Sequence, residues 1–180
     1  MTALHTRDAA WSRADFDAAA AKLAAALTAQ RATVLATLLD NGAAWALVDA
    51  AAERAGVVHV PLPAFFTAAQ RRHAIAAAGV DTLGAQPGFA PVGAALDLGP
   101  AGLGLAWRRL PATPVAMPAG TAKITFTSGS TGAPKGVCLS AAAMLAVAQG
   151  LAQALAPLSI ERHLCALPLP VLLENIAGVY

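Results

Sequence analysis

The first 84 residues alternate between helical and strand-like segments, and this alternation limits the possible folds more than any other feature. Short apolar runs at 33–39, 57–60 and 81–83 are typical of strands. Helices are predicted at 13 to about 30, at 43–55 and at 67–78, with capping boxes at Ser12/Asp15 and Thr67/Gln70 and closing glycines at 56 and 79. The pattern predicts an α/β fold, with a mostly parallel sheet, right-handed crossovers and helices on both faces.

The rest of the chain divides into two further parts of one domain. Residues 85–119 are rich in Gly and Pro and are interpreted as a connection that holds one possible strand, at 104–108. Residues 120–180 begin with an alternating strand at 123–127 that is expected to be half-buried. Further along we expect a returning strand at 136–139, a helix from Ser140 to about 156 that Pro157 stops, a strand at 163–169 and the start of a helix at 171–180.

Composition and charge exclude several partners. Hydrophobic residues make up 57% of the chain and charged residues 12%, so we expect part of the apolar surface to be covered by another body. A net charge of +2 with no basic block gives no footprint for nucleic acid or anionic membrane. Residues 136–160 carry no charge, but Met144, Leu151 and Leu155 recur at helical spacing opposite Gln149 and Gln153, which favours an amphipathic soluble helix over a membrane span.

The cysteines and histidines show no pattern of a metal site, and the remaining bulk features indicate a reducing environment. Cys138 and Cys165 lie in apolar runs with no partner pattern for a metal, so we expect buried free thiols. Charged residues interrupt the N-terminal segment, which argues against a secretory signal and favours a cytoplasmic location. The histidines lack ligand spacing and are expected in surface or packing roles; they are His5, His59, His73 and His163.

Residues 127–136 form the segment with the clearest chemistry. The ten residues combine glycines, hydroxyl side chains and one lysine: Thr127, Ser128, Gly129, Ser130, Thr131, Gly132, Ala133, Pro134, Lys135 and Gly136. Glycines let backbone N–H groups turn toward an anion, hydroxyls add donors, and a lysine supplies positive charge. Because Lys135 follows a proline and precedes a glycine, the segment is not a Walker loop. The composition predicts a polyphosphate-binding loop.

This segment resembles the phosphate-loop signature of the adenylate-forming superfamily, which includes acyl-CoA synthetases, luciferases and peptide-synthetase adenylation domains. Asn41, Trp45 and the run Val60-Pro61-Leu62 resemble an earlier pattern of that family. Residues 167–174 resemble a later family segment near the acyl and phosphate sites, with Val171 in place of the usual histidine. The resemblance covers residues 31–180, and 85–119 match it poorly.

The resemblance implies a two-step reaction that uses ATP and magnesium. A carboxylate attacks the α-phosphate of ATP and releases pyrophosphate, and a thiol, of coenzyme A or of carrier-protein phosphopantetheine, then takes the acyl group from the adenylate. The loop residues 127–132, with Lys135 and Gly136, would bind the β and γ phosphates, and the Thr127 hydroxyl would ligate magnesium. No residue of the chain is assigned a catalytic role, and Glu174 favours the relatives that act in fatty acid metabolism.

The family's later motifs, for adenine, ribose and a catalytic lysine, do not occur in the sequence. We therefore expect an N-terminal fragment that forms no acyl-adenylate by itself. Apolar surface exposed by truncation would allow self-association. The end of the chain, within an apolar helix, agrees with this expectation.

Two other functions compete with the ligase. Ser128 to Gly132 differ by one residue from a nucleophile elbow, which would make Ser130 the nucleophile of a serine hydrolase. No aspartate follows Ser130, and Glu161 and His163 are too close in sequence to be separate arms of a triad. The second alternative is a non-enzymatic binding module, or one half of a split ligase that docks a partner chain.

Overall fold

The computed structural model describes residues 2–7, 9–86, 95–96, 105–127 and 133–180. Its helices are α1 (Arg13–Ala29), α2 (Ala43–Ala55), α3 (Ala68–Ala77), α4 (Ala141–Leu155) and α5 (Leu172–Val179), with a 3-10 turn at Ala156–Leu158. Its strands are β1 (Thr2–His5), β2 (Ala10–Ser12), β3 (Val34–Leu38), β4 (Val58–Pro61), β5 (Thr82–Ala85), β6 (Ala95–Leu96), β7 (Leu105–Arg109), β8 (Thr121–Thr127) and β9 (Lys135–Ser140).

The helix ends follow from local side-chain chemistry. Thr67 and Gln70 form a reciprocal capping box at the start of α3, as predicted. At the start of α1, Ser12 Oγ accepts from Asp15 N at 3.1 Å, while the Asp15 carboxylate accepts from the same hydroxyl. Gly56 ends α2 in the left-handed region (φ 65°), where a side chain would be strained.

The described strands of the main sheet are ordered β6-β7-β5-β3-β4-β8-β9. The four strands in the centre, β5, β3, β4 and β8, run parallel, as the alternation predicts. Toward the edges β7 pairs antiparallel with β5 and β6, and β9 pairs antiparallel with β8. The sheet is therefore mixed, and β1 and β2 form a separate antiparallel ribbon before α1.

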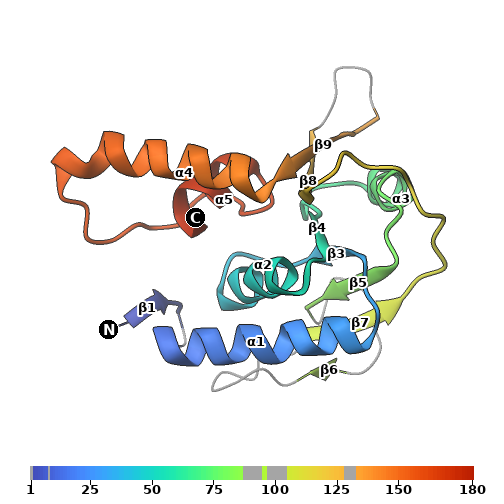
Figure 1. The fold of residues 1–180 in the computed structure, drawn as a ribbon, viewed down its shortest axis with the longest axis horizontal. Coiled ribbons are helices and arrows are strands. Elements are labelled where there is room, and N and C mark those ends of the chain that lie inside the picture. The colour runs from blue at the N-terminus through green and yellow to red at the C-terminus, as the bar shows by residue number, and fades with distance from the viewer. Residues whose placement is uncertain (1, 8, 87–94, 97–104, 128–132) are drawn as a thin grey trace.

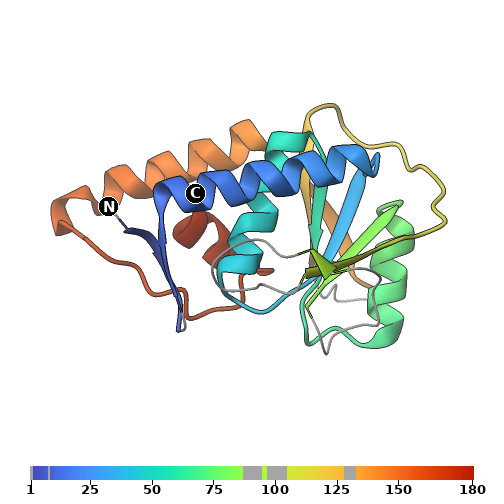
Figure 2. The same ribbon diagram turned by 90° about the horizontal axis from the view of Figure 1, so that it is seen from below.

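Helices cover both faces of the sheet. Figure 2 shows α1 and α2 on one side of the strands and α3 on the other. All five residues of β3 are buried because each face packs into its own apolar cluster. One cluster lies under α1 and α2 and includes Leu35, Trp45 and Trp107; the other lies under α3 and includes Val60 and Phe126.

The last two helices lie on the same side of the sheet as α1 and α2 (Figures 1 and 2). α4 contacts α5 through Met144, Ala148 and Ile176, but much of its remaining apolar surface is exposed. The stretch Ala141–Leu158 is long and apolar enough to cross a membrane, although one such helix is weak evidence for a span. The predicted amphipathic face is confirmed at Met144, whereas Leu155 is exposed.

Three further predictions from sequence are wrong. Residues 163–169 contain no strand, because backbone carbonyls of this described segment accept hydrogen bonds from the Asn41 side chain instead of from a neighbouring strand. Cys138 is exposed because β9 lies at the sheet edge, and Cys165 is only partly buried, although both thiols are free. Strand β8 is buried on both faces along Lys123–Phe126, so it is not half-buried.

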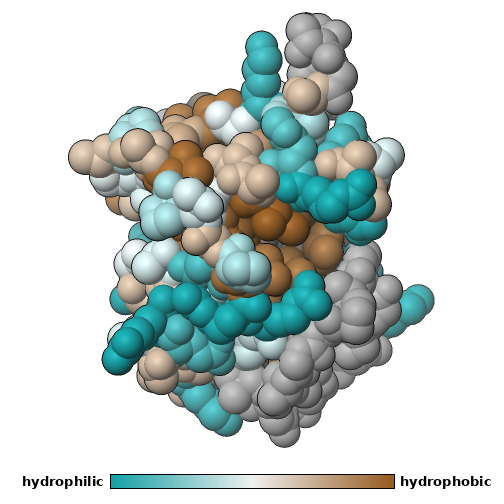
Figure 3. Space-filling model, turned by 90° about the vertical axis from the view of Figure 1, so that its right-hand side faces the viewer, coloured by the Kyte–Doolittle hydropathy of each residue, from teal (hydrophilic) through white to brown (hydrophobic). Residues whose placement is uncertain are grey.

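A shallow groove with a mixed polar and apolar lining lies on the α3 side of the molecule. Figure 3 looks onto this side, where apolar side chains lie between hydrophilic ones. The groove is lined by residues at the starts of β3 and β4, by Asp81 just before β5, by Arg109 at the end of β7 and by the segment after it, including Val34, Val58 and Met117. Parallel sheets bind ligands at the opposite edge, where the strands end, so this groove is separate from the site described next.

Candidate phosphate-binding site

The predicted phosphate loop joins the ends of β8 and β9. Thr127 is the last residue of β8 and pairs directly with Lys135, the first residue of β9. Both side chains are exposed, and directly paired residues project from the same face of a sheet. Five predicted loop residues lie outside the described part of the chain: Ser128, Gly129, Ser130, Thr131 and Gly132. Strands β8 and β9, which carry Thr127 and Lys135, lie at one edge of the described sheet (Figure 1).

The base of the loop is anchored on the α3 side. His73 Nε2 lies 3.0 Å from the carbonyl oxygen of Pro134, and donates to it in the tautomer that carries the proton there. Gly136 faces the same side, where a Cβ atom would lie 3.0 Å from Ile124 Cγ2 and 3.1 Å from Phe126 Cζ. The glycine at this position therefore has a packing role, since it lets the Phe126 ring lie against the backbone of β9.

A buried network of hydrogen-bonded polar side chains lies under the other face of β8. Lys123 Nζ donates to Asp49 at 2.8 and 2.9 Å and to Asn175 Oδ1 at 2.5 Å. Asp49 Oδ1 also lies 2.6 Å from His59 Nδ1, and His59 Nε2 lies 2.8 Å from Thr37 Oγ1. This polar network links β3, β4, α2, β8 and α5. Its member on β8, Lys123, lies four residues before Thr127 on the same face of the strand.

The electrostatics of this polar network keep Asp49 ionised. Burial by itself raises the pKa of Asp49, but the hydrogen bond from His59 and the positive charge of Lys123 lower it to about 2. Burial lowers the pKa of His59, which favours the neutral ring; Nδ1–H then donates to Asp49 and Nε2 accepts from Thr37. The buried charge of Lys123 is therefore matched by a carboxylate.

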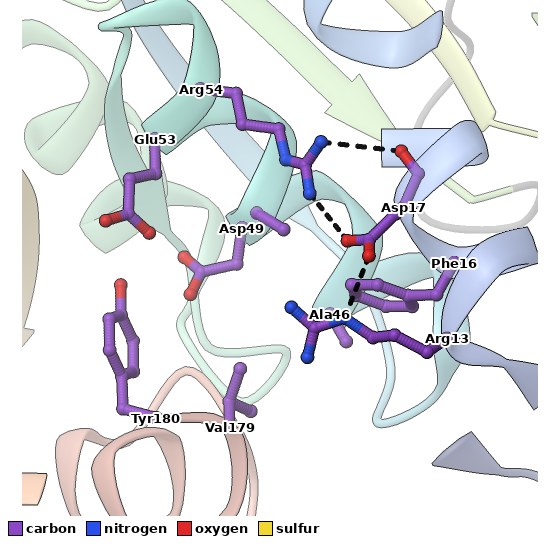
Figure 4. A pocket seen from close by; sticks show the side chains of 10 residues that line it. Arg13, Phe16, Asp17, Ala46, Asp49, Glu53, Arg54, Val179 and Tyr180 are labelled. Atoms are coloured by element: carbon purple, nitrogen blue, oxygen red, sulfur yellow. Dashed lines mark hydrogen bonds and ion pairs between the residues drawn. The ribbon is translucent and has the colours of Figure 1, made fainter. Parts of the chain in front are cut away.

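Two aromatic rings complete the surroundings of Lys123. Its ammonium lies 5.4 Å from the centre of the Trp45 ring and 4.8 Å from that of Tyr180. Figure 4 shows the Tyr180 hydroxyl directed toward Asp49 and Glu53, at a cavity of about 420 Å³ between α1, α2 and the end of α5. Burial and these two carboxylates raise the pKa of Tyr180, so its hydroxyl is a donor here.

This polar network was not predicted from the sequence, although the sequence contains a signal for it. Asp49 is the only acidic residue in the first ten positions of an otherwise apolar helix, and His59 and Lys123 lie in strands. Isolated polar residues in apolar elements are costly unless they are paired, so their coincidence indicates a buried network. The prediction of a packing role for His59 agrees with this position.

Asn41 fixes the segment that precedes α5. Its Nδ2 donates to the carbonyl oxygens of Cys165 and Leu167, at 3.2 and 2.7 Å, and its Oδ1 accepts from Leu169 N at 2.8 Å. Asn41 and residues 167–174, singled out separately in the sequence, are thus in direct contact. The contact fixes Leu169 against the core under α2.

Comparison with known proteins agrees with this fold. The sequence matches the family of AMP-binding enzymes over residues 1–180. The chain belongs to this family of adenylate-forming enzymes. A comparison with curated proteins finds no match.

Solved structures of similar fold include two structures of one enzyme and one structure of another. The structure of o-succinylbenzoate coenzyme A synthetase (MenE) from Bacillus subtilis with AMP has a TM-score of 0.69 at 23% identity over 97% of this chain and 49% of that one. The same enzyme with ATP and magnesium has a TM-score of 0.69 at 22% identity, over 97% and 50%. Amide bond synthetase McbA from Marinactinospora thermotolerans has a TM-score of 0.70 at 22% identity, over 97% and 39%. The chain spans about half the length of these structures or less.

The described part of the loop suits ATP and magnesium. Thr127 offers a hydroxyl oxygen of the kind that magnesium prefers, and Lys135 offers a cation. In the described part of the chain Lys135 makes no ion pair, so its ammonium is available to a phosphate. Ser130, the nucleophile of the competing hydrolase, lies outside the described residues, and His163 bonds Glu174.

Proposed function

We propose that this chain supplies the part of an AMP-forming acid:thiol ligase that holds the β and γ phosphates of ATP. The observation that carries the proposal is the pairing of Thr127 with Lys135 at the loop end of the β8–β9 hairpin, with both side chains exposed. A hydroxyl and an ammonium from opposite strands flank the glycine-rich loop. The end of a parallel strand is also where α/β sheets bind ligands.

The chemistry of these residues fits the departure of pyrophosphate. The Lys135 ammonium neutralises charge on the leaving group, and a group fixed beforehand is effective because it need not reorganise during the reaction. On one face the hairpin is fixed by the packing of Phe126 against Gly136, and on the other by the buried polar network of Lys123. Magnesium, when bound with ATP, would take the Thr127 hydroxyl and add further positive charge.

We further propose that the complete reaction needs groups from outside this sequence. Motifs that resemble the family's adenine, ribose and catalytic-lysine segments do not occur in it. The substrates proposed are a carboxylic acid, of which fatty acids are one class, and a thiol, of coenzyme A or of a carrier protein. The chain by itself is expected to give no carboxylate-dependent ATP–pyrophosphate exchange, and exchange by the purified chain would contradict this.

Calorimetric titration with magnesium pyrophosphate and MgATP tests the loop assignment. We expect the chain to bind both, and Lys135→Ala to weaken binding at least about tenfold, since a hydrogen bond to a charged group contributes roughly 1.5–3 kcal/mol. Arg72→Ala is the matched control because it removes an exposed cation of α3 outside the loop. Absence of binding by the unmodified chain, or equal weakening by both variants, would contradict the proposal.

A further inference from the structure

Three metal-ligating side chains converge beside α5, away from the phosphate loop. His163 and Cys165 come from the segment before α5, and Glu174 comes from its first turn. One donor atom of each lies within 4.8 Å of the other two, and His163 Nε2 is 3.0 Å from Glu174 Oε1. Ligands of a tetrahedral zinc ion lie about 3.3–3.8 Å apart, given bonds of roughly 2.0–2.3 Å, so small shifts would close this group around an ion.

The helix backbone makes room for this convergence at Gly178. A Cβ atom there would lie 2.7 Å from Cys165 Sγ and 3.1 Å from His163 Nε2. No side chain larger than hydrogen fits against the two donor atoms without moving them. This glycine, one turn after Glu174, therefore allows the thiol and the imidazole to approach the same side of α5.

The surroundings of the three side chains favour a cation. Glu174 is 5% exposed, and a buried carboxylate is costly without a positive partner. Among the described residues its ion pair is with His163, whose side chain is 45% exposed. Cys165, with Glu174 beside it, holds a second group that becomes negative when it binds metal. Lys123, the nearby buried cation, is already paired with Asp49.

We propose that His163, Cys165 and Glu174 form a Zn²⁺ site that ties the 163–165 segment to α5. A thiolate, an imidazole and a carboxylate are the ligand types that zinc takes in proteins, and the thiolate disfavours magnesium and calcium. Three protein ligands leave the fourth position to water, on the side where His163 is exposed. Zinc binding releases the Cys165 thiol proton to solvent as the Zn–S bond forms.

Such a site has a structural consequence for the buried polar network of Lys123. Glu174 is followed directly by Asn175, the residue that accepts from Lys123. A metal ion on Glu174 would therefore fix the first turn of α5 from one side while Lys123 holds it from the other. We expect zinc to raise the melting temperature of the chain, since a ligand that binds only the folded state stabilises it.

Cobalt substitution of the chelator-treated chain tests the site. We expect one Co²⁺ per chain, with a thiolate-to-cobalt charge-transfer band and the visible bands of four-coordinate cobalt, and displacement of Co²⁺ by Zn²⁺. Cys165→Ser should remove the charge-transfer band, and His163→Asn and Glu174→Gln should weaken binding at least about tenfold. Circular dichroism of each variant checks that it folds.

Cys138→Ser is the matched control, because Cys138 is the chain's other free cysteine and lies on exposed β9. It should keep the charge-transfer band, the stoichiometry and the zinc-induced rise in melting temperature. The proposal is overturned if the unmodified chain binds no stoichiometric metal. It is equally overturned if the band survives in folded Cys165→Ser or disappears in Cys138→Ser.

Discussion

Lys123 Nζ lies 2.8 Å from Asp49 Oδ1, so a buried ion pair joins the strand that leads into the phosphate loop to helix α2. Both side chains are less than 5% exposed. Removal of one partner from a buried pair leaves the other charge uncompensated in a low-dielectric environment. The pair therefore couples the position of β8 to the core.

Lys123→Met is expected to destabilise the chain by about 3–5 kcal/mol, because it leaves the Asp49 carboxylate buried without its cation. Urea denaturation followed by circular dichroism measures this change. Arg54→Met breaks the exposed pair with Asp17 and should have a much smaller effect. Equal losses in the two variants would show that the buried pair has no special role.

Stability should fall as the solution is acidified. The folded pKa of His59 lies below its ordinary 6.5, so below that pH the unfolded chain binds a proton that the folded chain resists. Asp49, with a folded pKa of about 2 against an ordinary 3.8, adds a second loss as pH falls through that lower range. Both groups contribute stability that is present at neutral pH.

Urea midpoints between pH 7.5 and 5 test the histidine. His59→Asn retains a donor near Asp49 without the titrating ring, so the slope of stability against pH should become flatter. His5→Asn, which removes an exposed ring, should leave the slope as it is. A slope that is the same in His59→Asn and in the unmodified chain would contradict the assignment.

Much of this architecture follows from local sequence signals. The limits of α2 and α3 are encoded by Gly56 and by the Thr67/Gln70 box, which act within a few residues and are therefore readable. The antiparallel placement of β7 depends on contacts with β5 more than twenty residues away, which periodicity does not report. The 163–169 segment has the composition of a strand, but its backbone bonds Asn41 across the molecule.

The loop of the candidate site could be predicted from the sequence, but the contacts around it could not. The loop chemistry is visible in the order of Thr127 to Gly136, and the structure adds that Thr127 and Lys135 are paired across the hairpin. The links from Lys123 to Asp49 and from Cys165 to Glu174 join residues distant in sequence. They depend on the packing of α2 and α5 and could not be read from spacing.

Gly136→Ala should destabilise the chain by about 1–3 kcal/mol, since its Cβ would press on Ile124 and Phe126. Gly150→Ala is the control: it lies within α4 with nothing within 4 Å of the new Cβ, and should stabilise by roughly 0.5–1 kcal/mol. Thermal unfolding distinguishes the two signs. A neutral or stabilising Gly136→Ala would argue against the packing role.

We propose that the exposed apolar side chains of α4 cause self-association. Leu145 and Val147 are each about half exposed, and exposed apolar side chains promote association. The double change Leu145→Gln/Val147→Gln should lower the average mass measured by light scattering at high concentration. Phe65→Gln, an exposed apolar residue before α3, should not. A monomeric unmodified chain would contradict the proposal.

The most direct test of the phosphate-loop assignment is the site at which an acyl-phosphate derivative of ATP modifies the chain. Such a reagent acylates a lysine that lies against the terminal phosphate, and the chain has three: Lys22, Lys123 and Lys135. Peptide mapping should place the acyl group on Lys135, and excess magnesium pyrophosphate should suppress it. Modification centred on the exposed Lys22, or labelling of Lys135 that pyrophosphate leaves unchanged, would contradict the account.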